Sequence, residues 1–274
     1  MKAKIHNLTH GDSNKTQIYL RNFFMERFLE RISVSFYQEN FVLKGGLLIA
    51  SLVGLDLRAT LDIDSTVKSI PLNEKDATQI IQEIIDVPLN DHVDFILTSV
   101  SVIMENLDYP GIRFTLLGSF DRIRQTIRID LSTDDVITPK AIFYNYKLMF
   151  VDRNIPLMAY NPETMLAEKI ETIIARGTAN TRMRDFYDVF LLSRQGDFDL
   201  HILRNAIMNT SKKRNSEQQL ANYSQIIQEV ASSSIMEVAW DGFKRQSYFA
   251  GDLSWQEVVG ENIMLIKKAL PAIK

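Results

Sequence analysis

The sequence predicts an α+β fold, with an N-terminal lobe built on a mixed or antiparallel sheet and a C-terminal helical lobe. Before residue 132, several stretches alternate apolar and polar residues as half-buried strands do, and from residue 161 onward apolar residues recur at helical spacing. At 274 residues the chain exceeds one typical domain. We therefore expect residues 1–145 to form the first lobe and residues 146–274 a helical lobe that closes a cleft against it.

Composition indicates a folded chain that stays in the cytoplasm. Hydrophobic residues make up 46% and charged residues 24%, the balance of an ordinary globular protein. The most hydrophobic stretch is flanked by Lys44 and Asp56 and is too short to cross a bilayer. No apolar segment of the kind found in a secretory signal follows Lys2 and Lys4. We expect no membrane partner.

The same composition restricts the kind of metal site that the chain can hold. It has no cysteine, and its four histidines, at positions 6, 10, 92 and 201, do not have the His-x-x-x-His spacing of a zinc site. Oxygen ligands and magnesium are the better expectation. The net charge of −3 gives no overall basic surface, so binding of nucleic acid would need a local patch.

The predicted elements of the first lobe follow in chain order. Its helices are expected at 15–37, at 47–53, where Gly54 ends the helix, and at 73–85, where Asn73 is the N-cap. A short strand at 41–43 leads into Lys44-Gly45-Gly46, and a half-buried strand covers 60–66. Three more strands are expected at 94–104, 113–120 and 126–132. The turn signal Asp108-Tyr109-Pro110-Gly111 between the first two indicates an antiparallel meander.

The C-terminal half has the apolar spacing of helices throughout. They are predicted at 162–176, 184–194, 200–209, 218–230 and 255–270, with Pro162 at a first helical position. The basic run Lys212-Lys213-Arg214 is expected to be a solvated loop, with a minor alternative as an RNA phosphate contact.

Paired acids on a predicted strand are the first candidate for chemistry. Asp62 and Asp64 leave the same face of the strand, roughly 7 Å apart at Cα, and Thr60 shares that face. Such a pair can recruit Mg²⁺ together with a triphosphate, although an isolated Asp-x-Asp is more often a solvated strand face. Asp130 alternates with apolar residues in a second strand. If the two strands are neighbours, three carboxylates share one site and would repel one another unless divalent cations neutralise them.

The second candidate is the glycine turn at Lys44-Gly45-Gly46, which precedes a helix. Two residues without side chains let phosphate oxygens approach the N–H groups at the start of that helix. The order of a P-loop is absent, and an EF-hand is excluded because Val67 stands where glycine is required. Asp134 and Asp135, just after the Asp130 strand, are interpreted as turn residues.

Taken in this order, the motifs resemble those of the AbiEii/AbiGii nucleotidyltransferase toxins, which belong to the DNA polymerase β-like nucleotidyltransferase superfamily and include the MenT toxins. The resemblance spans roughly residues 15–192. The stretches that carry it are Phe41-Val42-Leu43-Lys44-Gly45-Gly46, Arg58-Ala59-Thr60-Leu61-Asp62-Ile63-Asp64, Arg128-Ile129-Asp130, Ala167-Glu168-Lys169 and Arg184-Asp185-Phe186-Tyr187-Asp188.

The resemblance implies roles for individual residues. Lys44, Gly45, Gly46 and Thr60 would bind the incoming nucleoside triphosphate, and Asp62 and Asp64 would bind Mg²⁺ or Mn²⁺, with Asp130 as a third metal ligand. Lys169 would contact phosphates, and Asp185 would support activity from the helical lobe. Without the resemblance, Lys169 reads as a solvent lysine paired with Glu168 or Glu171, and Arg184, Asp185 and Asp188 as charges that stabilise the start of a helix.

Three functions stay open at this point. The first is a magnesium-dependent nucleotidyltransferase toxin of a toxin-antitoxin system that defends against phage by abortive infection. It would transfer a nucleoside monophosphate to an acceptor, with tRNA favoured because related toxins modify tRNA. The second uses the same site to modify a protein hydroxyl. The third is a catalytically silent module that binds nucleoside triphosphates and a partner. The resemblance implies a separately encoded antitoxin.

Overall fold

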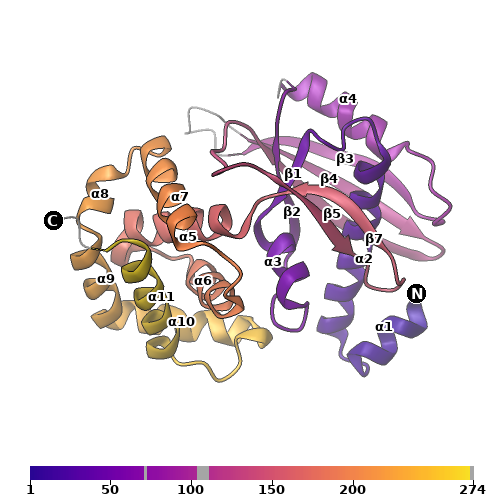
Figure 1. Cartoon of the computed structure of the whole chain (residues 1–274). Coiled ribbons are helices and arrows are strands. Elements are labelled where there is room, and N and C mark those ends of the chain that lie inside the picture. The colour runs from indigo at the N-terminus through magenta and orange to yellow at the C-terminus, as the bar shows by residue number, and fades with distance from the viewer. Residues whose placement is uncertain (71–72, 104–110, 272–274) are drawn as a thin grey trace. The chain divides into compact units, whose positions relative to one another are not determined.

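A computed structural model describes residues 1–70, 73–103 and 111–271 (Figure 1). This part of the chain contains eleven α-helices and seven β-strands. Its contacts divide it into two compact units. Unit 1 consists of residues 1–135 and 142–159, and unit 2 consists of residues 136–141 and 160–274.

Unit 1 is built on a mixed sheet of seven strands in the order β3-β4-β5-β2-β1-β7-β6. The strands are β1 (Phe41–Lys44), β2 (Asp62–Val67), β3 (Asp94–Ile103), β4 (Gly111–Phe120), β5 (Ile123–Ser132), β6 (Ile142–Lys147) and β7 (Asn154–Ala159). β2 runs parallel to β5, and β1 runs parallel to β7. The expected meander of β3, β4 and β5 is present and antiparallel. Residues 108–110 of its turn signal lie outside the described residues.

The last two strands lie where the sequence predicts no regular structure. β6 and β7 pair with each other, and β7 pairs with β1, so residues 146–159 belong to the sheet and not to the helical part. Inward-facing Ile155, Leu157 and Ala159 do alternate along β7. Pro156 interrupts them, and proline inside a run argues against a strand. A boundary after residue 145 therefore cuts through β6.

The helices of unit 1 pack against the sheet or against one another. They are α1 (Lys2–Thr9), α2 (Ser13–Val34), α3 (Gly45–Val53) and α4 (Glu74–Ile85). Figure 1 shows α2 running across the sheet. Phe24 and Phe28 of this helix pack edge-on against Phe95 of β3. Gly118 of β4 faces the same side, and a Cβ there would lie under 3.0 Å from Phe24. The face opposite α2 carries the polar residues of β2, β4 and β5.

Unit 2 is helical. Its α-helices are α5 (Pro162–Arg176), α6 (Met183–Gln195), α7 (Leu200–Lys213), α8 (Glu217–Ala221), α9 (Tyr223–Ser232), α10 (Ser234–Gln246) and α11 (Trp255–Ala269). The single helix expected at 218–230 is divided between α8 and α9 at Asn222, and α10 was not predicted. Lys212 and Lys213 end α7 instead of forming a loop. Among the described helices, none is both long and apolar enough to cross a membrane.

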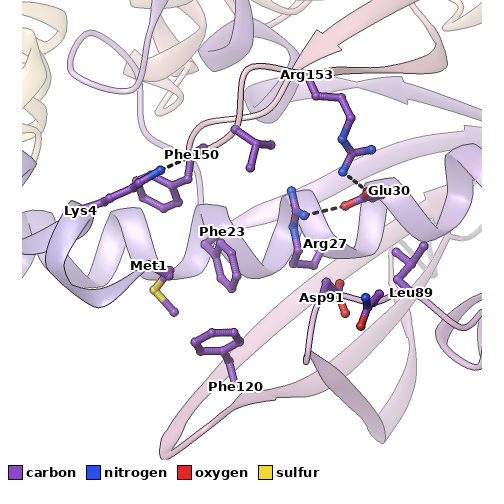
Figure 2. A pocket seen from close by; sticks show the side chains of 12 residues that line it. Met1, Lys4, Phe23, Arg27, Glu30, Leu89, Asp91, Phe120, Phe150 and Arg153 are labelled. Atoms are coloured by element: carbon purple, nitrogen blue, oxygen red, sulfur yellow. Dashed lines mark hydrogen bonds and ion pairs between the residues drawn. The ribbon is translucent and has the colours of Figure 1, made fainter.

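A buried polar network lies along α2, on the side away from the polar sheet face. The network lines a pocket of about 480 Å³, where Arg27 forms an ion pair of 2.6 Å with Glu30. Figure 2 shows that Glu30 also binds Arg153. One turn before Glu30, Glu26 is 2% exposed and accepts hydrogen bonds from Asn22 Nδ2 and the Met149 N–H, each at 3.1 Å. Burial raises the pKa of the Glu26 carboxyl to about 7.

We predict that Glu26 makes the protein less stable as pH rises. Its carboxyl ionises near 4.5 when the chain is unfolded and near 7 when it is folded, so the stability present below pH 4.5 is lost between these values. The loss is roughly 3 kcal/mol. Urea unfolding between pH 5 and 8 should show wild type losing stability relative to Glu26→Gln as pH rises. Parallel pH profiles for the two proteins would contradict the assignment.

Candidate active site

Four charged residues on four neighbouring strands form one row across the polar face of the sheet. Arg113 on β4 pairs in register with Asp130 on β5, Asp130 with Asp64 on β2, and Asp64 with Lys44 on β1. Adjacent strands hold such partners roughly 5 Å apart at Cβ. The predicted proximity of Asp64 and Asp130 is therefore confirmed. We call these four residues the charged row, in which two carboxylates lie between two cations.

Asp62 is a further acid on the same face of β2, beside Arg128 of β5. It lies two residues before Asp64 and pairs in register with Arg128 of β5. Thr60, which is 4% exposed, donates from Oγ1 to Asp62 Oδ1 at 3.3 Å, so it contacts the carboxylate predicted to bind metal. Asp62, Asp64 and Thr60 are thus brought together in unit 1.

Asp64 is the most electrostatically perturbed of these acids. Burial and the neighbouring charges of Asp62 and Asp130 raise the pKa of its carboxyl to about 6, while Lys44 and a hydrogen bond from the Gly46 N–H oppose the rise. Carboxylates held this close favour any bound cation that lowers their mutual repulsion. Asp64 is therefore suited to a site that binds positive charge.

The glycine turn is shaped by its contact with Asp64. Gly45 has a φ of 68°, which favours glycine, and a Cβ at this position would lie under 3.0 Å from the Asp64 carboxylate. At Gly46 a Cβ would lie 2.6 Å from Thr60 Oγ1 and 2.9 Å from the buried Arg58 guanidinium. The absence of side chains at these two positions makes room for Asp64, Thr60 and Arg58, and the approach of a phosphate to this turn stays a prediction.

Asp130 is engaged by an arginine that the sequence analysis did not single out. Arg113 donates from Nε to Asp130 Oδ1 at 2.7 Å and from Nη2 to Oδ2 at 2.6 Å. This hydrogen bonding raises the pKa of the Arg113 guanidinium. A bidentate pair occupies both carboxylate oxygens. Asp130 can therefore bind a metal only if Arg113 releases one of these two oxygens.

Lys44 is held by a carboxylate that was interpreted as a turn residue. Its Nζ donates to Asp135 Oδ2 at 2.6 Å, and the same oxygen accepts hydrogen bonds from Thr66 Oγ1 and from Ser132 Oγ, the latter at 2.7 Å. Burial raises the pKa of the Asp135 carboxyl, but Lys44 and the two hydroxyls outweigh it, so the pKa stays below its usual value. Asp135 is a fourth carboxylate beside the acids.

The oxygen donors of this face fit a hard cation such as Mg²⁺. Asp62 and Asp64 offer carboxylates on one strand face, and Asp64 is partly buried by a turn that leaves no room for another side chain. Within residues 1–70, 73–103 and 111–271, no three acid, histidine or cysteine side chains are arranged as a ready-made metal site. The fit therefore rests on these two residues, with further ligands to come from substrate and water.

The two predicted residues of unit 2 lie together in that unit. Lys169 on α5 donates from Nζ to Asp185 Oδ1 of α6 at 2.9 Å, and it also forms a 2.8 Å ion pair with Asp188. The Asp188 side chain is 0% exposed and that of Lys169 is 14% exposed. The alternative partners Glu168 and Glu171 instead form ion pairs with Arg214. Asp188 belongs to the stretch that carries the family resemblance, but the sequence assigned it no role beyond a charge at the start of a helix.

The glycine turn gives a prediction that separates backbone strain from contact with Asp64. Gly196 has a φ of 70°, close to the 68° of Gly45, but nothing lies within 4 Å of its added Cβ. Gly196→Ala should cost about 1 kcal/mol of unfolding free energy. Gly45→Ala should cost more, and the double variant Gly45→Ala/Asp64→Ala should recover part of the excess. Urea unfolding measures all three, and equal losses in the two glycine variants would contradict the contact.

The buried ion pair of unit 2 gives a second prediction. Lys169→Met leaves the Asp188 carboxylate buried without that cation and should destabilise the protein by roughly 3–5 kcal/mol. Lys169→Met/Asp188→Asn should recover much of the loss, because the fully buried carboxylate is then uncharged. Asp185→Asn, at a site 14% exposed, should cost less than Lys169→Met. Additive losses in the double variant, measured by denaturant unfolding, would rule out the coupling.

Comparison with known proteins identifies the family of this chain. The chain is 14% identical to JHP933 of Helicobacter pylori, with a TM-score of 0.55 and coverage of 92% of this chain and 91% of that one. A second Helicobacter pylori structure, provisionally described as a nucleotidyltransferase, gives 14% identity, a TM-score of 0.56 and coverage of 92% and 94%. No match was found among curated proteins. The model of the nucleotidyl transferase AbiEii toxins of type IV toxin–antitoxin systems matches residues 27–261. The chain therefore belongs to the AbiEii nucleotidyltransferase toxin family.

Proposed function

We propose that the protein transfers a nucleoside monophosphate from a nucleoside triphosphate to tRNA, with release of pyrophosphate. Family membership supports a nucleotidyltransferase that uses a nucleoside triphosphate and has an antitoxin counterpart. The observation that carries the proposal is the pairing of Asp64 with Asp130 between Arg113 and Lys44. This row concentrates carboxylates beside a tight glycine turn at the start of a helix.

The residues of the acid face have distinct tasks in this proposal. Asp62 and Asp64 would hold divalent cations, Mg²⁺ or Mn²⁺, which when bound supply charge compensation for the triphosphate and alignment of the attacking oxygen. Asp130 is a conditional ligand because Arg113 binds it. When Asp130 is bound elsewhere, the Arg113 guanidinium is available to a phosphate oxygen.

The glycine turn would position the triphosphate. Phosphate oxygens bind well at a helix N-terminus, and α3 begins at Gly45. The Gly46 N–H already donates to Asp64, so a triphosphate bound at this turn would lie next to that carboxylate. Lys44 carries positive charge at the same point, with Asp135 fixing the direction of its ammonium group.

Lys169 and Asp185 remain proposed contributors from unit 2. In that unit Lys169 is held by Asp185 and by the buried Asp188, which restricts the position of its ammonium group. A restrained cation can bind a phosphate with a smaller loss of conformational entropy than a free lysine side chain. The proposed role is a phosphate contact by Lys169, with the two aspartates positioning it.

The proposal also places the protein in phage defence by abortive infection, where modified tRNA would stop translation in the infected cell. Two alternative functions would use the same site or bind the same nucleoside triphosphate. Transfer to a protein hydroxyl would use the same acids, and a silent module would bind nucleoside triphosphates without chemistry. The intact charged row favours catalysis, because the Asp64–Asp130 pair places like charges in register where a divalent cation would relieve their repulsion.

Transfer can be tested with purified protein, each α-³²P-labelled nucleoside triphosphate, Mg²⁺, and either bulk tRNA or a protein extract. We expect label on tRNA and its loss on addition of EDTA. Asp62→Asn and Asp64→Asn should each lower the rate by a hundred-fold or more, because metal-mediated charge compensation is worth several kcal/mol. Asp12→Asn, at the N-cap of α2, is a matched control and should keep full activity.

Each other outcome of the assay has a clear meaning. Label on protein alone would select the second function, and binding of triphosphate without any label would select the third. Wild-type rates in Asp62→Asn and Asp64→Asn would remove these two residues from the active site. Thermal melts of every variant show whether lost activity reflects lost folding.

A further inference from the structure

The polar face of the sheet continues beyond the charged row along β5. Arg128 and Arg124 follow on the same face as Asp130, because alternate residues of a strand share a face. Arg128 pairs with Thr115 of β4, and Arg124 pairs with Ser119. The side chains of both arginines are exposed. The two positions lie four residues apart, or roughly 13 Å along the strand.

A third arginine, on α2, is electrostatically coupled to Arg128. Arg21 of α2 lies within electrostatic range of Arg128 and Asp62. Burial and the positive charge of Arg128 lower the pKa of its guanidinium, and Asp62 partly offsets them. Two cations held near each other gain from an anion that binds both.

These arginines differ from the paired arginines of unit 1. Arg27, Arg31 and Arg113 each contact a carboxylate. In the described part of the chain, by contrast, Arg21, Arg124 and Arg128 have neither an ion-pair contact nor a side-chain hydrogen bond. Asp94 shares a row with Arg124, but Ser119 of β4 lies between them. The charges of the exposed Arg124 and Arg128 are therefore available to a ligand on this face.

We propose that Arg124 and Arg128 form a phosphodiester-binding strip that leads the acceptor RNA to Asp62 and Asp64. The inference rests on the proposed transfer to tRNA, and it adds where the acceptor binds. Arginine side chains spaced along a strand and accompanied by hydroxyl groups suit a repeating phosphate backbone. A protein acceptor would require acidic side chains at the same spacing, which is a narrower class of partner.

Charge and position also distinguish this strip from the triphosphate site. Along β5, Arg124 lies roughly 20 Å from Asp130 and roughly 13 Å from Arg128, the residue paired with Asp62, so it is the arginine of the strip farther from the acids. Arg128 lies beside Asp62 and could serve either ligand. Arg124 therefore tests the RNA strip, and Arg128 tests where the strip meets the nucleotide.

The experiment measures tRNA binding and transfer separately. Binding of 5′-fluorescein-labelled bulk tRNA is followed by fluorescence anisotropy at several salt concentrations. Arg124→Ala and Arg128→Ala should each weaken binding about five-fold and reduce the slope of log Kd against log salt by about one, as loss of a phosphate contact does. Lys75→Ala, which removes an exposed cation from α4, should leave both quantities unchanged.

Transfer assays with the same variants identify the ligand. For Arg124→Ala, the KM for tRNA should rise about five-fold, while the KM for the nucleoside triphosphate and kcat stay at wild-type values. Failure of wild type to bind tRNA, or wild-type binding by both variants, would overturn the strip. A raised KM for the triphosphate alone would also overturn it. If the variants bind tRNA more weakly but wild type transfers no label to it, the strip stands and the proposed reaction is refuted.

Discussion

The pairing of Asp64 with Asp130 on adjacent parallel strands is the constraint on which the rest of the site depends. Two carboxylates in register repel each other unless cations compensate them. The protein supplies Arg113 at one end of the row and Lys44 at the other, and each is itself fixed by direct contact with a carboxylate. The sheet can therefore hold the two carboxylates close together without a metal ion and can still bind a metal ion there.

The elements around the row follow from that requirement. A side chain at Gly45 would collide with Asp64, so the turn between β1 and α3 must be free of side chains at this point. The same turn donates the Gly46 N–H to Asp64, which joins the acid site to the start of α3. On the other face of the sheet, Phe24 and Phe28 of α2 pack against Phe95 and provide the rigid support that a site on strands requires.

Sequence patterns predicted the acids and the glycine turn because both depend on local spacing. Alternation placed Asp62 and Asp64 on one strand face, and it placed Asp130 on the polar face of β5. The partners Arg113 and Asp135 were missed because they depend on strand register and on a loop that folds back. Phe120 pairs with Ile123 across a short turn at Asp121 and Arg122, and this register brings Arg113 to Asp130. β7 was missed because Pro156 interrupts its alternation.

The central claim, that Asp62 and Asp64 form a binding site for metal and nucleotide, can be tested by Mn²⁺ electron paramagnetic resonance. Free Mn²⁺ is titrated with wild type, Asp62→Asn and Asp64→Asn, with and without a non-hydrolysable nucleoside triphosphate analogue. The account predicts that wild type binds Mn²⁺ more tightly when the analogue is present, because metal and phosphates share ligands. Both variants should lose this enhancement. Equal enhancement in wild type and the two variants would contradict the account.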